Sequence, residues 1–232
     1  MNLESKVCVA ATYLGPLSYF AHLLNAKEVW IEQHENYLKQ TYRNRCVILA
    51  ANGIMVLSIP VDKGNRSNCP IRDVRLSTHS DWQTLHWRSI ESAYNSSAFF
   101  DYYRDDFEAI YQKQWTFLFD FDLQFLETVF RCLDLSPNIR FTEFYEKTCA
   151  AEWEDLRYSI VHSSTRSQNV GCAMIPYYQV FHQKFGFIPN LSIIDLLFNM
   201  GPESVLILQK MIEGVNVSHH ETNHNKDLYP RE

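Results

Sequence analysis

The chain has 232 residues and a net charge of −6, and 46% of its residues are hydrophobic and 14% aromatic. This length and apolar content suffice for one large domain or two small ones with a sizeable core. The acidic balance excludes long-range attraction to nucleic acid or to anionic membranes, so any phosphate group must be bound by a local cluster of arginine and lysine.

The sequence also lacks the segments that direct a chain to or across a membrane. No stretch reaches the ~18 consecutive apolar residues of a membrane span, and the first twenty residues lack a basic leader and apolar run. Six cysteines are scattered without a C-x-x-C pair, which is typical of reduced thiols. We therefore expect a soluble cytoplasmic protein.

The chain begins with the pattern of a βαβ unit. Residues 6–14 (KVCVAATYL) are rich in β-branched and small side chains, as in a buried strand. Residues 16–26 have apolar side chains at helical spacing, and residues 28–33 (EVWIEQ) form a second short apolar segment. This order predicts two parallel strands with a right-handed connection.

Two further strands and a possible third follow. Residues 46–50 (CVILA) and 54–61 (IMVLSIPV) flank Asn52-Gly53, which is the strongest short-range signal for a β-hairpin. Residues 71–76 (IRDVRL) alternate in polarity, and this pattern predicts another strand.

From Asp81 onward the pattern is mainly helical. Residues 81–112 carry a helical stripe of aromatic side chains, and Asp122 is expected to cap a further helix that ends before Ser136-Pro137. Residues 139–146 (IRFTEFYE) resemble a strand that returns to the sheet.

Near the carboxyl end, Ser192 and Asp195 have the spacing of a capping box, and Gly201 ends the helix that they begin. The sequence thus predicts a single α/β domain over residues 1–213. It has a mixed sheet with an N-terminal βαβ unit and a β-hairpin, and its second half is rich in helices. Residues 214–232 are polar and without period, as in a disordered tail.

The tail contains an H-E-x-x-H pattern from His220 to His224. A zinc peptidase needs both histidines on one face of a buried helix, with the glutamate placed as base. The surrounding residues offer no apolar face that could bury such a helix. We interpret the pattern as a coincidence in a polar tail and expect neither a metal nor a cofactor.

Residues 30–45 (WIEQHENYLKQTYRNR) are the strongest candidate for a site. They follow a predicted parallel strand, where α/β sheets usually place their ligands. The segment combines possible proton-transfer groups (Glu32 and His34), possible anion-binding groups (Lys39, Arg43, Asn44 and Arg45), and aromatic rings. The alternative is an exposed charged connection with locally packed tyrosines.

Three residues elsewhere are further candidates for ligand contacts. Tyr13 ends the first predicted strand, where its hydroxyl could reach a crevice. His86 and Trp87 could line one wall of a cleft, although a histidine among aromatic residues is more often a satisfied core residue. There is no glycine-rich phosphate loop and no G-x-S-x-G elbow.

The chain resembles the WbqC-like protein family through several motifs that occur in order over residues 7–212. These are Tyr13, Leu17, Tyr19 and Phe20; Lys39, Thr41, Tyr42, Asn44 and Arg45; Ile59-Pro60-Val61; Trp82, His86, Ile90, Tyr94, Phe99 and Phe100; and the complete S-I-I-D-L-L-F-N segment from Ser192 to Asn199. Where the family pattern has His-Gln-Pro, this chain has Val9-Ala10-Ala11, and Gln33-His34 stands where relatives often carry an acidic pair.

The family occurs among genes for O-antigen and other surface polysaccharides, and this company implies transfer of an acyl or aminoacyl group to an amino sugar. The expected ligand is therefore a small anionic molecule such as a nucleotide-linked or phosphorylated amino sugar. Lys39, Asn44 and Arg45 would hold its anion, and His34 or Glu32 would take the proton. The missing His-Gln-Pro residues favour the alternative, a non-catalytic binding or scaffold protein of envelope assembly.

Overall fold

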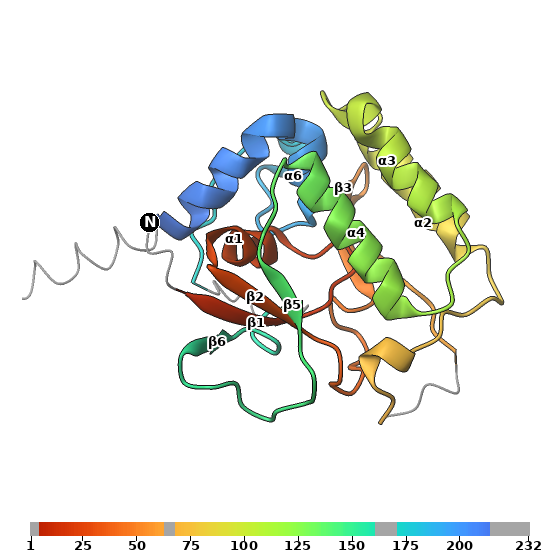
Figure 1. Ribbon diagram of the computed structural model, residues 1–232. Coiled ribbons are helices and arrows are strands. Elements are labelled where there is room, and N and C mark those ends of the chain that lie inside the picture. The colour runs from red at the N-terminus through yellow and green to blue at the C-terminus, as the bar shows by residue number, and fades with distance from the viewer. Residues whose placement is uncertain (1–4, 63–67, 161–170, 214–232) are drawn as a thin grey trace, which may run out of the picture.

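A computed structural model describes residues 5–62, 68–160 and 171–213 of the chain (Figure 1). Its strands are β1 (Lys6–Ala10), β2 (Glu28–Glu32), β3 (Arg45–Ala50), β4 (Gly53–Ser58), β5 (Ile139–Phe141) and β6 (Trp153–Asp155). Its helices are α1 (Leu17–Asn25), η1 (Ile71–Asp73), α2 (Trp82–Tyr94), α3 (Phe100–Gln112), α4 (Leu118–Cys132), α5 (His182–Phe185), α6 (Ile193–Met200) and η2 (Gly201–Glu203). A last helix covers residues 204–213.

The first three elements form the predicted βαβ unit, and this prediction is confirmed. Strands β1 and β2 pair in parallel from Lys6 opposite Glu28 to Ala10 opposite Glu32, with α1 between them in the chain. Strands β5 and β6 add to the two edges, so that the sheet has the order β5-β2-β1-β6 and every pair is parallel.

The two faces of this sheet have different surroundings. Side chains alternate along a strand, and Val7, Val9, Val29 and Ile31 all belong to the main hydrophobic core. Figure 1 shows α1 and the C-terminal helices above the sheet and the loop between β5 and β6 below it. The intervening side chains of β1 and β2 therefore face that loop instead of the core, which leaves room for a site on the lower face.

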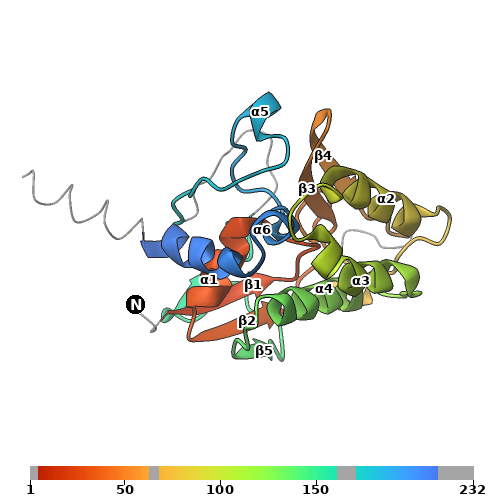
Figure 2. The ribbon, with the colours of Figure 1, turned by 90° about the horizontal axis from the view of Figure 1, so that it is seen from above.

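The predicted hairpin is also confirmed, and it forms a separate two-stranded sheet of β3 and β4. Its closing pair is Ala50 and Gly53, so the turn residues are Ala51 and Asn52. Gly53 has φ +112°, a backbone conformation that favours glycine. Figure 2 shows that the hairpin stands apart from the four-stranded sheet, beside α2.

The strand predicted over residues 71–76 is wrong. Ile71–Asp73 form the 3₁₀ helix η1, and the next residues make only the isolated bridges Val61–Leu76 and Arg75–Phe117. Pro70 starts the turn, and Ile71 and Val74 are buried, so the alternating pattern reflects anchoring of a loop by two apolar side chains.

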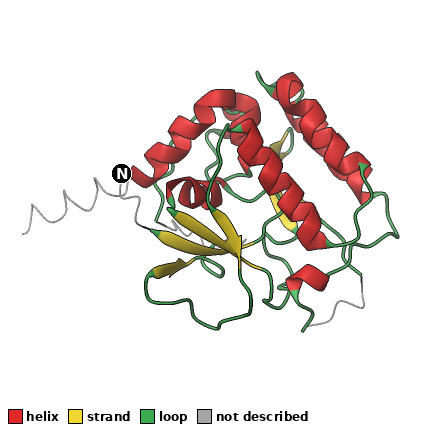
Figure 3. Cartoon of the chain, viewed as in Figure 1, coloured by secondary structure: helices red, strands yellow, loops and turns green. Residues whose placement is uncertain are grey.

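The helical second half is confirmed, with α2, α3 and α4 gathered on one side of the molecule (Figure 3). The expected cap at Asp122 is wrong, because α4 begins at Leu118 and Asp122 lies inside its second turn. The Asp122 carboxyl is 1% exposed, and no described group hydrogen-bonds to it. Burial raises its pKa well above the usual range, so the group is expected to be neutral.

The capping box at the start of α6 is only half formed. Ser192 is the N-cap residue and its side chain accepts a hydrogen bond from the backbone N–H of Ile194. The reciprocal bond from Asp195 is absent because the backbone N–H of Ser192 already donates to Val47 O at 2.8 Å.

The Asp195 carboxylate instead joins three parts of the chain. It accepts hydrogen bonds from the hydroxyl of Tyr94 (2.9 Å), the hydroxyl of Tyr177 (2.6 Å) and the side-chain amide of Gln179 (3.0 Å). Asp195 is 1% exposed. Burial raises its pKa to about 6, although these three donors act in the opposite direction.

Two expectations concern membranes and the tail. No helix within the described residues is long and apolar enough to span a bilayer. Residues 214–232, with their H-E-x-x-H pattern and the predicted disorder, lie outside the described residues.

The raised pKa of Asp195 predicts a pH-dependent stability. Between about pH 4 and about pH 6 the Asp195 carboxyl keeps its proton in the folded state but loses it in the unfolded state. The free energy of unfolding should therefore fall as the pH rises through that range. The contribution of this residue should amount to about 3 kcal/mol. Urea unfolding of the wild type and of Asp195→Asn at each pH isolates this contribution, since the variant has no titratable group at position 195.

The difference between the two proteins should therefore change between pH 4 and pH 7. Asp73→Asn, at an exposed position, is the matched control for exchanging a carboxylate for an amide. A constant difference for Asp195→Asn would contradict the assignment.

Candidate functional site

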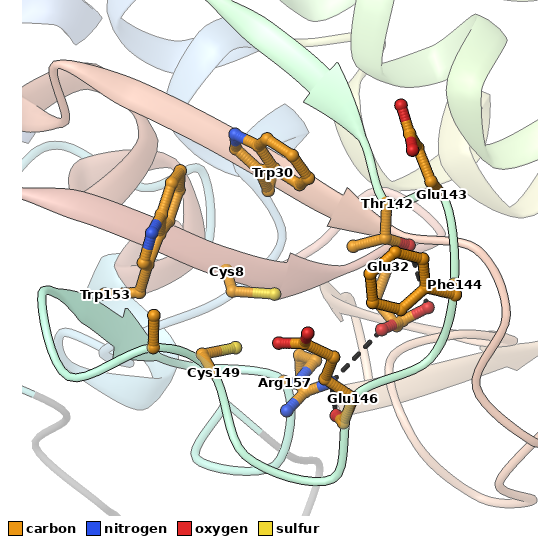
Figure 4. Close-up of a pocket in the computed structure, with 11 residues that line it drawn as sticks. Cys8, Trp30, Glu32, Thr142, Glu143, Phe144, Glu146, Cys149, Trp153 and Arg157 are labelled. Carbon is orange, nitrogen blue, oxygen red and sulfur yellow. Dashed lines mark hydrogen bonds and ion pairs between the residues drawn. The ribbon is translucent and has the colours of Figure 1, made fainter.

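A pocket of about 350 Å³ lies between the lower face of the four-stranded sheet and the loop that joins β5 to β6 (Figure 4). Its lining comes from β1, β2, β6 and the segments that follow β5 and β6. The lining residues are Cys8, Trp30, Glu32, Thr142, Glu143, Phe144, Glu146, Cys149, Ala150, Trp153 and Arg157. This volume is at the lower end of the ~300–1,000 Å³ range of small-molecule sites.

Two tryptophans form an aromatic wall of the pocket. The rings of Trp30 and Trp153 are 5.3 Å apart between centroids and inclined by 71°. Trp30 donates its indole N–H to Glu28 at 3.1 Å, and the ammonium group of Lys6 lies 5.2 Å from the centroid of Trp153. Each ring therefore has a charged neighbour.

A buried carboxylate closes the other end of the pocket. Glu32, the last residue of β2, accepts hydrogen bonds from the hydroxyl of Thr142 (2.9 Å), the backbone N–H of His34 (2.7 Å) and the guanidinium of Arg157 (3.1 Å). Both Glu32 and Arg157 are about 1% exposed. An ionised carboxylate can accept about four hydrogen bonds, so one acceptor position on Glu32 is left over after the three donors among the described residues.

Arg157 is the centre of the charged part of the site. Its guanidinium also binds both carboxylate oxygens of Asp155, at 2.9 and 2.6 Å. Burial alone would raise the pKa of Asp155, but the hydrogen bonds from Arg157 outweigh it and hold that pKa below the usual range. The same guanidinium donates to the backbone carbonyls of Glu146 (2.8 Å) and Lys147 (3.4 Å). Arg157 therefore ties the loop that covers the pocket to the sheet.

The pocket contains two thiols, which Figure 4 shows directed into the same space. Burial raises the pKa of Cys8 and that of Cys149. Both thiols are therefore protonated near neutral pH, which disfavours a thiolate nucleophile. Within the described residues, no group of three or more histidine, cysteine, aspartate or glutamate side chains is placed to hold a metal ion.

Of the candidate segment 30–45, Glu32 and the aromatic residue Trp30 line this pocket. His34 lies next to it, because its ring Nε2 is 3.1 Å from the backbone oxygen of Thr142. The two predicted proton-transfer residues are therefore brought together by one neighbour, Thr142. Their catalytic roles remain predictions.

The predicted anion-binding residues have other surroundings. Arg43 is buried and makes two hydrogen bonds of 2.6 Å to the carboxylate of Glu35, so its charge is already compensated. Asn44 donates to the backbone oxygen of Ile59, Arg45 begins β3, and Lys39 is exposed. Anion binding by this group remains a prediction. The charge of Arg43 gives it little support, because Glu35 already compensates that charge.

Tyr13, His86 and Trp87 lie in the aromatic core. The Tyr13 hydroxyl is 2.9 Å from His86 Nδ1 and 2.6 Å from the Tyr111 hydroxyl, and Trp87 stacks on Phe100. Burial lowers the pKa of His86 to about 4, so the imidazole is neutral. This surrounding matches the alternative of a satisfied core histidine.

The sequence reasoning missed most of the pocket, although one signal was present. In residues 6–10 (KVCVA) and 28–32 (EVWIE), the aliphatic residues alternate with Cys8, Trp30 and Glu32. This period of two marks a second, non-core face of the sheet. Trp153 and Arg157 carried no such signal, because β6 has only three residues and its neighbours lie far away in the sequence.

The position of Arg157 predicts a large loss of stability on its removal. Arg157→Ala should lower the free energy of unfolding by roughly 3–5 kcal/mol, because Glu32 would keep a buried charge without its cation. Amide hydrogen exchange of residues 142–152 should accelerate, since two backbone anchors of the loop are lost.

Arg140→Ala is the matched control for this prediction. It removes another sheet-side ion pair, 3.0 Å from Glu28, but its side chain is 60% exposed, and it should cost less than ~1 kcal/mol. Equal exchange of the loop in wild type and Arg157→Ala would refute the anchoring role.

Comparison with known proteins gives a family and one curated relative. The model of the WbqC-like protein family matches residues 11–165 and 160–207. A protein of Mycobacterium tuberculosis, "Uncharacterized protein Rv1507c", is 26% identical over 223 residues, which cover 87% of this chain and 96% of that protein. No solved structure matches the chain. Since the family model spans most of the sequence, the chain belongs to the WbqC-like protein family.

Proposed function

We propose that the protein is a transferase that attaches an acyl or aminoacyl group to an amino sugar, and that the sugar binds in the pocket between Trp30, Trp153 and Glu32. The observation that carries this proposal is the combination of an aromatic wall with a buried carboxylate that has one free acceptor position. Aromatic faces suit the C–H faces of a sugar ring, and the carboxylate suits its amine.

The charge of the lining favours the amine over a phosphate. Three glutamates and one arginine line the pocket, and the arginine is already neutralised by Glu32 and Asp155. The amino-sugar part of an activated sugar therefore fits the pocket better than its nucleotide or phosphate part.

The reaction then follows from the position of Glu32. The amine of the sugar attacks the carbonyl carbon of the donor, a C–N bond forms, and the bond from that carbon to the leaving group breaks. The amine loses a proton to the free position on Glu32, and the departing group finally takes up a proton. Arg157 and Thr142 hold the carboxylate in place throughout.

A second candidate is a binding or scaffold protein that keeps the pocket without turnover. Three observations favour it. The Glu32 carboxylate is already paired with Arg157, and both pocket thiols are protonated. The chain also has Val9-Ala10-Ala11 in place of His-Gln-Pro, so the end of β1 carries no group that can transfer a proton.

The proposal predicts selective binding of amino sugars. Isothermal titration calorimetry should detect glucosamine binding to the wild type but weaker binding of glucose, which lacks the amine. Trp153→Ala should weaken glucosamine binding by roughly tenfold, because the sugar loses one aromatic face. Tyr102→Ala removes an exposed aromatic ring on α3, outside the pocket, and should change nothing.

Turnover separates the two candidates. A panel of acyl thioesters and aminoacyl donors is incubated with glucosamine, and amide formation is followed by mass spectrometry. Amide formation that is lost in Glu32→Gln supports the transferase, and binding without any product selects the scaffold. Equal affinity for glucose and glucosamine would rule out the amino-sugar pocket itself.

A further inference from the structure

Three exposed aromatic side chains lie in the pocket lining or beside residues that form it. Phe144 is 63% exposed, Tyr145 is 45% exposed and Tyr158 is 43% exposed. Phe144 lines the pocket (Figure 4), and the Arg157 guanidinium, which also lines it, lies over the rings of Tyr145 and Tyr158. Large exposed aromatic groups beside a pocket are typical of a surface that binds something.

The two tyrosines are held in place from below. Their hydroxyl oxygens are 3.3 Å apart, and the buried Arg157 guanidinium lies 5.6 Å from the centroid of each ring. Arg43 lies 5.7 Å from the centroid of Tyr158. Cations over the rings restrict their motion, so the exposed parts of both rings form a prearranged platform that a ligand can contact at little cost in side-chain entropy.

A single sugar unit inside the pocket does not reach the platform. The pocket volume of about 350 Å³ suits a sugar unit that packs against the wall formed by Trp30 and Trp153. Tyr145 and Tyr158 lie outside its lining, where only a ligand that leaves the pocket could reach them. Glu143 and Glu146 also lie along this route. Negative charge beside aromatic rings matches a chain of aminated sugars and opposes a chain of anionic ones.

We propose that the acceptor is an oligosaccharide of amino sugars, with one unit in the pocket and the following units on Phe144, Tyr145 and Tyr158. This inference rests on the proposed function for the unit inside the pocket. It adds that the oligosaccharide continues outward over the platform, so the substrate class is a glycan and not a free monosaccharide.

The test compares ligands of increasing length. Glucosamine and its β-1,4-linked oligomers of two, three and four units are titrated into the wild-type protein by calorimetry at 0.3 M salt, which limits non-specific attraction between charges. The affinity should rise by roughly fivefold or more between one unit and three units, because each stacked ring adds favourable contact. An affinity that does not depend on length overturns the inference.

Variants identify the residues that cause the gain in affinity with ligand length. In Tyr145→Ala and Tyr158→Ala the ratio of trimer to monomer affinity should fall toward one, whereas Tyr158→Phe, which keeps the ring, should retain most of the ratio. Tyr102 is 77% exposed on α3, outside the pocket, so Tyr102→Ala should leave the ratio unchanged. Thermal unfolding of each variant verifies that it is folded. A wild-type ratio in both alanine variants overturns the platform.

The outcomes distinguish this inference from the proposed function. If the wild type binds glucosamine but its affinity does not rise with the length of the oligomer, the inference fails and the proposed function stands. If the wild type binds neither glucosamine nor its oligomers, the proposed function fails, and the inference fails with it.

Discussion

The site depends on one buried guanidinium. Arg157 binds Glu32 at the end of β2, Asp155 at the end of β6, and two backbone carbonyls of the loop that covers the pocket. Five donors in a fixed fork can serve such a set of acceptors, which the single point charge of a lysine cannot. Arg157 therefore ties the ends of β2 and β6 to the loop that covers the pocket.

A second buried pair extends the same network. Arg43 binds Glu35 with both ends of its fork, and its Nη2 also donates to the backbone oxygen of Arg157 at 3.1 Å. The segments after β2, before β3 and after β6 are thus joined by two arginines that each have their own carboxylate. A buried ion pair is costly to break, so Arg43, which composition placed in a ligand site, helps to hold these segments together.

The sequence was informative where the pattern is local and repetitive. The βαβ unit, the hairpin and the helical second half follow from periodicity and turn chemistry, and each is present. Asp195 shows the limit of local reasoning. Its spacing from Ser192 indicates a capping box, but tertiary contacts with Tyr94 and Tyr177 determine where its carboxylate lies.

The pocket shows the same limit on a larger scale. Its two tryptophans are 123 positions apart in the chain, and they meet only because β6 pairs with β1 beside β2. The residues that carry the family resemblance have a different place in the molecule. Tyr13 and His86 are hydrogen-bonded within the aromatic core, and Asn44 supports the entry to β3.

Family membership therefore supports the fold of this chain more directly than its chemistry, because the motifs that define the resemblance maintain the core. The acceptor position on Glu32 and the aromatic surface that leads away from it lie outside most of those motifs, on the opposite face of the sheet. Two proteins could share every core motif and still differ in the ring at position 153 or 158. Such a pair would have the same fold but different ligands.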